Sequence, residues 1–237
     1  MKNYNITLIG DSIAKGIATE NMRLTRLDTC ASILVGEYLG ANINNLSVYG
    51  QTIGRVEEKK LVEKYIENLD KSKNNKVVFS IGGNDADFDW VEVGKNPSFN
   101  HQPKTSHKIF ETTLRKMIRM LKNEGVDVWI TGLPPVDSYR YFDRVICKIA
   151  NGENVLDFLD EDISNIQRHQ EFYNFLLYKI AVTENCGFLD IRSIFLKDKN
   201  FLEKFCSDGV HPNKEGHKMI ADEIIKQIEL HRQNKRL

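Results

Sequence analysis

Ser12, Asp208 and His211 have the side-chain types that nucleophilic catalysis requires, although they lie near opposite ends of the chain. A serine hydroxyl is a poor nucleophile until a neighbouring imidazole removes its proton, and the imidazole needs a further group to orient it. Asp208 precedes His211 by three residues in a loop that contains a glycine, so its carboxylate can reach the ring across one turn. This pattern is compatible with acyl transfer. Residues 6–12 alone favour a plainer interpretation, in which Ser12 is only a helix N-cap.

Acyl transfer also requires hydrogen-bond donors for the oxyanion that develops on the attacked carbonyl group. The candidates are the backbone N–H groups of Ser12 and Gly50 and the side-chain amide of Asn84. Because Gly50 has no side chain, a substrate can approach its backbone closely. Asp11 and Asp85 stand beside two of these residues, but acids at strand-end turns are usually turn-stabilising acceptors, and we assign them no catalytic role.

Alternating strand and helix patterns must position these groups. The expected strands cover residues 6–9, 42–49, 76–81, 126–131 and 187–191. The expected helices cover residues 31–39, 56–69, 106–123 and 163–184, and a last helix follows Asn213 with Ile220, Ile224 and Ile228 facing inward. Five strands separated by helices predict an α/β fold of one domain over residues 1–237, with a parallel sheet covered by helices on both faces.

The candidate groups all follow predicted strands. Ser12 comes after the first strand, Gly50 after the second and Asn84 after the third, and the loop with Asp208 and His211 comes after the fifth. The carboxyl ends of parallel strands lie along one edge of the sheet, where ligands bind. We therefore expect these distant residues to converge on one crevice.

Four short segments resemble the signature blocks of the SGNH hydrolases, also called GDSL-type esterases or lipases/acylhydrolases. The blocks are Gly10-Asp11-Ser12-Ile13, Asn45 with Gly50, Gly82-Gly83-Asn84-Asp85, and Asp208-Gly209-Val210-His211-Pro212. Single blocks of this kind recur by chance, but four in order, each after a strand, form a specific pattern. The one departure is Ile13, where the namesake motif has leucine at a packing position.

The resemblance implies a flavodoxin-like three-layer α/β/α sandwich and ester hydrolysis without a metal or another cofactor. By position it makes Ser12 the nucleophile, His211 the base and Asp208 the orienting acid. It also implies that the oxyanion hole comprises Ser12, Gly50 and Asn84. The expected function is a serine esterase that cleaves a small carboxylic ester through an acyl-serine intermediate.

Three alternatives remain at this stage. The segment Ser12-Ile13-Ala14-Lys15 fits the Ser-x-x-Lys pattern of penicillin-recognising acyl enzymes, and residues 104–106 loosely fit their third motif. In that case Lys15 replaces the imidazole, although Lys15 is more simply a solvated helix residue. A second alternative is an acyltransferase that uses the same triad and passes the acyl group to another alcohol. A third is a non-catalytic binding protein, which the occupied catalytic positions argue against.

The apolar residues show no regular helix or strand spacing at residues 86–105 and 133–162. We therefore expect long loops there, over the active-site edge, and long loops are often functional. Their aromatic residues either line a substrate pocket or anchor the loops; we take as pocket candidates Phe88, Trp90, Tyr139 and Tyr141. Charged residues lie between these aromatics: Asp87, Asp89, Asp137 and Arg140. This mixture favours a small polar ester, such as an acetylated sugar, over a long-chain lipid.

The overall composition limits the partners. Lys+Arg and Asp+Glu each number 33, so the zero formal charge gives no sign of binding to nucleic acid or to an anionic membrane. No segment approaches the ~18 consecutive apolar residues of a membrane span, and the N-terminus lacks an apolar signal-peptide core. The four cysteines form no CxxC pair and have no metal-ligand spacing, which indicates reduced thiols in a cytoplasm. The expected partner is a small-molecule ester, and the sequence does not predict an oligomeric state.

Overall fold

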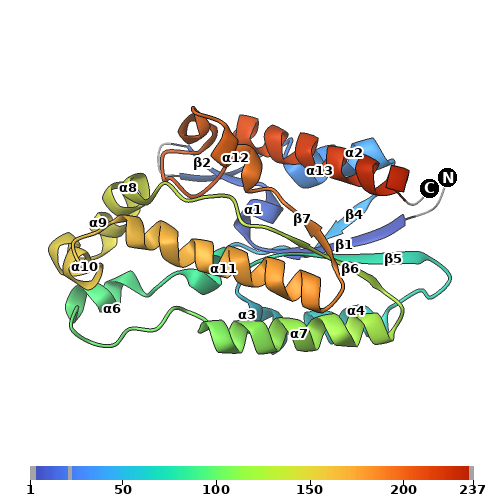
Figure 1. The fold of residues 1–237 in the computed structure, drawn as a ribbon, viewed down its shortest axis with the longest axis horizontal. Coiled ribbons are helices and arrows are strands. Elements are labelled where there is room, and N and C mark those ends of the chain that lie inside the picture. The colour runs from blue at the N-terminus through green and yellow to red at the C-terminus, as the bar shows by residue number, and fades with distance from the viewer. Residues whose placement is uncertain (1–3, 21–22, 235–237) are drawn as a thin grey trace.

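Five parallel strands form the centre of the computed structural model, which describes residues 4–20 and 23–234 (Figure 1). The strands are β1 (Tyr4–Gly10), β4 (Ile43–Asn45), β5 (Asn74–Ser80), β6 (Asp127–Thr131) and β7 (Gly187–Leu189). Their spatial order is β4-β1-β5-β6-β7, with every neighbouring pair parallel. The second strand along the chain thus lies outside the first, which is the flavodoxin-like order. The predicted fold class is confirmed.

The main hydrophobic core lies on one face of this sheet. Because successive side chains of a strand point to opposite faces, Ile9, Val77 and Phe79 share this face, and all three are fully buried. They pack against α3 (Ile53–Glu58), α4 (Leu61–Glu67), α7 (His107–Asn123) and α11 (Ser164–Thr183). The apolar stripe of α7 is buried there, namely Phe110, Leu114, Met117, Ile118 and Leu121.

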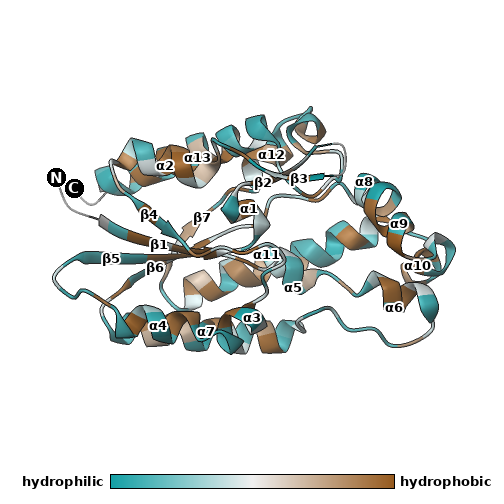
Figure 2. Cartoon of the chain, turned by 180° about the vertical axis from the view of Figure 1, so that it is seen from behind, coloured by the Kyte–Doolittle hydropathy of each residue, from teal (hydrophilic) through white to brown (hydrophobic). Residues whose placement is uncertain are grey.

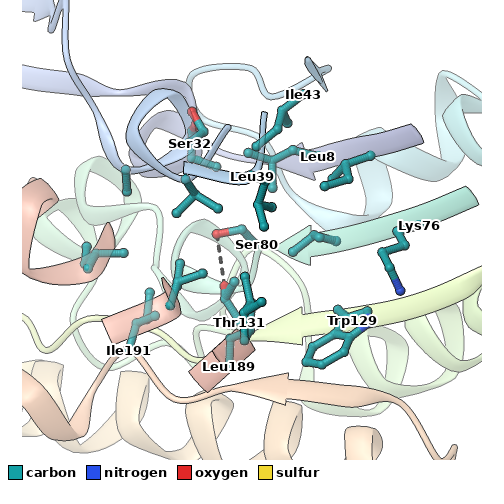
Figure 3. A pocket seen from close by; sticks show the side chains of 18 of the residues that line it. Leu8, Ser32, Leu39, Ile43, Lys76, Ser80, Trp129, Thr131, Leu189 and Ile191 are labelled. Carbon is teal, nitrogen blue, oxygen red and sulfur yellow. Dashed lines mark hydrogen bonds between the residues drawn. The ribbon is translucent and has the colours of Figure 1, made fainter. Parts of the chain in front are cut away.

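Helices α2 (Ala31–Leu39) and α13 (Lys214–Asn234) cover the opposite face of the sheet (Figure 1). This side is less tightly filled, and a cavity of about 920 Å³ lies between the strands and the two helices. Figure 3 shows its floor, where Leu8, Ser80 and Thr131 project from neighbouring strands. The Thr131 hydroxyl lies 3.0 Å from the Ser80 hydroxyl, so this floor is partly polar. Ser12, Asp208 and His211 do not line this cavity but a second one.

Several predicted elements differ in extent from the observed ones. The helix expected at residues 56–69 is divided into α3 and α4 at Lys60, which has a left-handed φ of +51°. α3 begins earlier than expected because the Thr52 hydroxyl accepts a hydrogen bond from the Arg55 N–H at 3.3 Å and caps the helix. The strand expected at 42–49 is shorter and ends at Asn45. The other predicted strands and helices agree to within three residues at each end.

The two stretches predicted as long loops instead contain short helices beyond the carboxyl ends of the strands. The first begins at the last residue of α5 (Gly83–Ala86) and holds α6 (Trp90–Lys95). The second holds α8 (Ser138–Tyr141), a π-helical turn η1 (Phe142–Ile146), α9 (Cys147–Ile149) and α10 (Gly152–Phe158). Helices α6 and α8–α10, which we call the outer lobe, carry hydrophobic segments on α6 and α9 (Figure 2). The prediction of structureless loops is wrong because these short apolar segments pack against each other, in a cluster that includes Trp90, Val93, Ile146 and Val155.

The sequence patterns also gave no indication of an antiparallel hairpin that follows the short helix α1 (Ser12–Lys15). It consists of β2 (Ile17–Glu20) and β3 (Arg23–Arg26). Toward the other end of the chain, α12 (Ser193–Lys197) and the 3₁₀ turn η2 (Phe201–Lys204) precede the loop with Asp208. None of the helices within the described ranges is long and apolar enough to cross a membrane.

Candidate active site

Ser12 is the first residue of α1, immediately beyond the carboxyl end of β1. The Asp11 carboxylate caps this helix by accepting a hydrogen bond from the Ile13 N–H at 2.9 Å. A Cβ atom on Gly10 would lie 2.5 Å from the Ala14 Cβ and 2.7 Å from the Ser80 carbonyl oxygen. Only glycine therefore permits this abrupt turn, which fixes Ser12 at the sheet edge.

Ser12, His211 and Asp208 form one continuous hydrogen-bonded array. The His211 Nε2 lies 2.9 Å from the Ser12 Oγ, and its Nδ1 lies 2.7 Å from the Asp208 Oδ2. Since an ionised carboxylate only accepts, Nδ1 carries the proton and Nε2 presents its lone pair to the serine hydroxyl. All three residues are buried. The structure thus brings together the three residues that the sequence singled out from the two ends of the chain.

The environment of Asp208 keeps this carboxylate ionised. Burial alone would raise the pKa of Asp208, but hydrogen bonds and the charge of His211, with further donors, outweigh it and lower the pKa to about 2. Its Oδ1 accepts hydrogen bonds from the N–H groups of Val210 at 2.9 Å and His211 at 3.1 Å. Asp208 is consequently an acceptor for the His211 ring at any pH near neutrality.

The candidate oxyanion donors Gly50 and Asn84 line the same cavity as Ser12. Gly50 has a φ of +65°, a conformation that suits glycine, and its carbonyl oxygen accepts a hydrogen bond from Arg55 at 3.1 Å. Among the described residues, neither its N–H nor the Asn84 side-chain amide has a hydrogen-bond partner. Asn45 holds this side of the site to α1 through a hydrogen bond to the Ala14 carbonyl at 2.9 Å. The site therefore contains unoccupied donors near Ser12.

Asp11 and Asp85, the sequence neighbours of Ser12 and Asn84, are both buried acids. Asp85 accepts the Ile53 N–H at 2.9 Å, so both carboxylates accept backbone hydrogen bonds, as predicted. Burial raises the pKa of Asp11 to about 6, against the opposing effects of the Ile13 hydrogen bond and the His211 charge. Burial, with the charge of Asp11, raises the pKa of Asp85 to about 7. Both acids are therefore partly protonated near neutral pH.

We expect Asp85→Asn to reduce the pH dependence of stability. A raised pKa means that the folded protein binds more protons than the unfolded chain between pH ~4 and ~7, so this acid makes the free energy of unfolding fall as pH rises. A shift from 3.8 to about 7 corresponds to at most about 4 kcal/mol, since one pKa unit is worth about 1.4 kcal/mol. Asparagine keeps an oxygen for the Ile53 N–H but does not ionise. Urea denaturation at pH 5 and pH 8 measures the difference.

The matched control is Asp222→Asn, which neutralises an exposed acid on α13. This variant should show the same change in unfolding free energy between the two pH values as the wild type. An Asp85→Asn variant that loses as much stability as the wild type between pH 5 and pH 8 would contradict the raised pKa of Asp85.

A cavity of about 810 Å³ opens over the triad and extends toward the outer lobe. Three of the predicted pocket residues, Phe88, Trp90 and Tyr141, line it, whereas Tyr139 does not. The prediction for Tyr139 is wrong: its side chain is 66% exposed, because α8 turns this residue away while Tyr141 faces inward. Volumes of this size are typical of small-molecule sites.

Asp87 holds several side chains of this cavity in place. Its carboxylate accepts hydrogen bonds from the Trp90 indole at 2.8 Å, the Tyr141 hydroxyl at 3.0 Å and the Lys104 ammonium at 2.7 Å. Burial, with the nearby Asp87 charge, raises the pKa of Tyr141 well above its ordinary value. The aromatic residues thus both line the cavity and join the segment after α5 to α8.

Several lining residues were missed by the sequence patterns, among them one polar and two aromatic side chains close to the predicted groups in sequence or in space. Thr19 lies on the unpredicted hairpin, Tyr49 follows the shortened strand, and His169 lies on α11. The Tyr49 ring is nearly parallel to that of His211, with centroids 6.3 Å apart. Burial lowers the pKa of His169, whose ring centroid is 4.9 Å from that of Phe88. The one available signal was for Tyr49, which directly precedes Gly50 in the second block.

The Ser-x-x-Lys alternative lacks the contact that it requires. Lys15 is the last residue of α1 and has no hydrogen bond to Ser12 among the described residues, because His211 occupies the position beside the serine hydroxyl. Lys104, from the supposed third motif, pairs instead with Asp87. The base next to Ser12 is an imidazole.

Comparisons with known proteins agree with this arrangement. The sequence profile of the GDSL-like Lipase/Acylhydrolase family matches residues 8–219. Similar solved structures include a lipase/acylhydrolase from Enterococcus faecalis, with a TM-score of 0.63 and 19% identity over 98% of this chain and 97% of that one. They also include a variant of an acetyl xylan esterase from Geobacillus stearothermophilus, with a TM-score of 0.63 and 19% identity over 96% and 97% of the two chains.

A member of the lipolytic G-D-S-L family from Veillonella parvula has a TM-score of 0.63 and 14% identity over 94% of this chain and 97% of that one. No curated protein sequence matches the chain. At these identities the solved structures show a shared fold, whereas the family profile spans all four signature blocks up to the loop with His211. The resemblance stated from those blocks is confirmed, and the chain belongs to the GDSL-like lipase/acylhydrolase family.

Proposed function

We propose that this protein is a serine esterase that hydrolyses small carboxylic esters through an acyl intermediate on Ser12. The observation that carries the proposal is the array in which the His211 Nε2 lies 2.9 Å from the Ser12 Oγ while its Nδ1 lies 2.7 Å from Asp208. These distances lie within the range that proton transfer to a general base requires. Membership of an acylhydrolase family is consistent with this chemistry.

In the first half-reaction the Ser12 Oγ forms a bond to the ester carbonyl carbon, and its proton passes to the His211 Nε2. The carbonyl oxygen becomes an oxyanion, for which we propose the N–H groups of Ser12 and Gly50 and the Asn84 amide as donors. The carbon–oxygen bond to the alcohol then breaks, and His211 gives its proton to the departing alcohol. Asp208 stabilises the imidazolium throughout but remains ionised.

In the second half-reaction water replaces the alcohol. His211 removes a proton from water as the oxygen attacks the acyl carbon, and the same donors stabilise the second oxyanion. The bond to the Ser12 Oγ breaks, the serine recovers its proton from His211, and the carboxylic acid leaves. No group outside these residues is needed for the proton balance.

The cavity supports a small polar ester, such as an acetylated carbohydrate, as the substrate class. Its walls combine aromatic rings with charged and amide side chains, including Asp89, Arg55 and Gln170. Aromatic faces cover apolar sugar faces, while polar groups bind hydroxyls. The acetyl xylan esterase with a similar fold acts on a substrate of this class. A panel of acetyl, butyryl and octanoyl esters should show the highest kcat/KM for acetyl.

The decisive test is covalent labelling. A fluorophosphonate probe should add one mass increment to the folded protein, located on the peptide that contains Ser12, because only an activated serine reacts readily with such probes. Ser12→Ala should abolish the labelling, and mass spectrometry of the digested protein measures it.

Ser98→Ala is the matched control, since Ser98 is exposed after α6 and does not line the active-site cavity. This variant should label like the wild type. Absence of an adduct on the wild type, or an adduct that persists in Ser12→Ala, would contradict the proposed function.

A further inference from the structure

The Asp208 carboxylate accepts four hydrogen bonds, which is the full capacity of its two oxygens. Three of the donors belong to its own loop: the N–H groups of Val210 and His211 and the His211 ring. The fourth is the Thr19 hydroxyl, which donates to Oδ2 at 2.5 Å from a position 189 residues away in the chain. Thr19 is thus the donor that connects the catalytic carboxylate to another part of the fold.

Thr19 belongs to β2 of the hairpin, and it holds the catalytic loop at two points. Besides its hydroxyl bond to Asp208, its N–H lies 3.3 Å from the Cys206 Sγ. Thr19 and Asp208 are only 6% and 5% exposed, so little water reaches the hydrogen bond between them. Thr19 pairs with Leu24 across the hairpin, and both residues line the active-site cavity. The hairpin therefore covers the Asp208 side of the triad.

We propose that Thr19 is a positioning residue of the triad: its hydroxyl fixes the plane of the Asp208 carboxylate and thereby the orientation of the His211 ring. This inference rests on the proposed esterase function. The Oδ2 atom that accepts from Thr19 is the same atom that accepts from the His211 Nδ1. A rotation of the carboxylate would consequently move the acceptor of the imidazole and misdirect Nε2 relative to Ser12.

The same bond also sets the charge that faces His211. A hydroxyl donor spreads the negative charge of the carboxylate, so its removal leaves a more basic Asp208 beside the ring. Protonated His211 is then stabilised more strongly, and a higher pH is needed to obtain the neutral base. Loss of the hydroxyl should therefore slow the reaction. It should also shift the acid limb of the pH–rate profile to higher pH.

Thr19→Val tests the proposal because valine keeps the shape of threonine and lacks the hydroxyl. We expect kcat to fall roughly 10- to 100-fold, the range that corresponds to one hydrogen bond to a charged group, with KM changed less than about 3-fold. The acid limb of the pH–rate profile should move upward by about half a unit. Thr19→Ser, which restores a hydroxyl, should recover kcat to within about 5-fold of the wild type.

Rates are expressed per active site titrated with a fluorophosphonate, which separates a fall in kcat from a loss of folded protein. Thr25→Val is the matched control, because the Thr25 hydroxyl contacts the Ala18 carbonyl on the same hairpin, at 3.4 Å, and does not contact the triad. Its kcat and its acid limb should equal those of the wild type. Thr19→Ala makes the same test with a smaller side chain if the valine variant does not fold.

The outcomes separate the two proposals. A wild type that neither labels at Ser12 nor hydrolyses esters overturns the proposed function, and the role of Thr19 with it. A wild type that labels, beside a Thr19→Val variant with unchanged kcat per titrated site and an unchanged acid limb, overturns the role of Thr19 alone. The same holds if neither hydroxyl-free variant folds, since Thr19 is then a structural residue.

Discussion

His211→Ala should lower kcat for a small activated ester by about 10⁴- to 10⁶-fold, the range found when the base of a serine triad is removed. The Ser12 hydroxyl then has no acceptor for its proton, because the His211 Nε2 is the group within hydrogen-bond distance of its oxygen. Raising the pH should not restore activity, since no other side chain among the described residues has a hydrogen bond to the Ser12 hydroxyl. Single-turnover kinetics from pH 5 to pH 9 measure the effect.

His107→Ala provides the control, because His107 is exposed on α7 and does not line the active-site cavity. It should leave kcat unchanged. Asp208→Ala should be milder than His211→Ala, with a loss of about 10²- to 10⁴-fold, because the backbone of the loop still holds the imidazole close to Ser12. A His211→Ala variant with near-normal activity would refute the mechanism.

Asn84→Ala should lower kcat by about 10²- to 10³-fold, which is the usual cost of removing one side-chain donor from an oxyanion hole. KM should change little, because the hydrogen bond to the carbonyl oxygen strengthens only as negative charge develops in the transition state. Steady-state kinetics on a series of activated acetyl esters measure the two constants separately.

The comparison variant is Asn68→Ala, which removes an exposed amide at the end of α4. It should match the wild type in both constants. If Asn84→Ala instead raised KM and kept kcat, Asn84 would bind the ground state of the substrate and would not belong to an oxyanion hole.

The parts of the site that the sequence predicted are those set by local patterns and by the topology of parallel sheets. Short apolar runs that end in Gly10 or in Gly82 mark strand ends, and one rule places all such ends along a common edge. Ser12, Asn84 and His211 were therefore found without any knowledge of their contacts. The approximate extent of α7 was predicted for the same reason, since its apolar stripe is regular over 17 residues.

The parts that the sequence did not predict depend on contacts between distant segments. Strands β2 and β3 of the hairpin have a weak apolar alternation, and the hairpin is held by contacts of Thr19 with Cys206 and Asp208. The outer lobe has helices too short to show a period, and they form because they pack against one another. Tyr139 and Tyr141 are two residues apart, and no pattern in the sequence indicates which of them turns inward.

The outer lobe has a hydrophobic cluster of its own, separate from the core beneath the sheet. The triad rests on the strand ends and the final loop, whereas the far wall of the cavity rests on this second cluster. Substitutions and insertions in the lobe can thus reshape the substrate pocket while the sheet keeps its packing. During evolution, selectivity can change in the lobe at little cost to the framework that carries the catalytic chemistry.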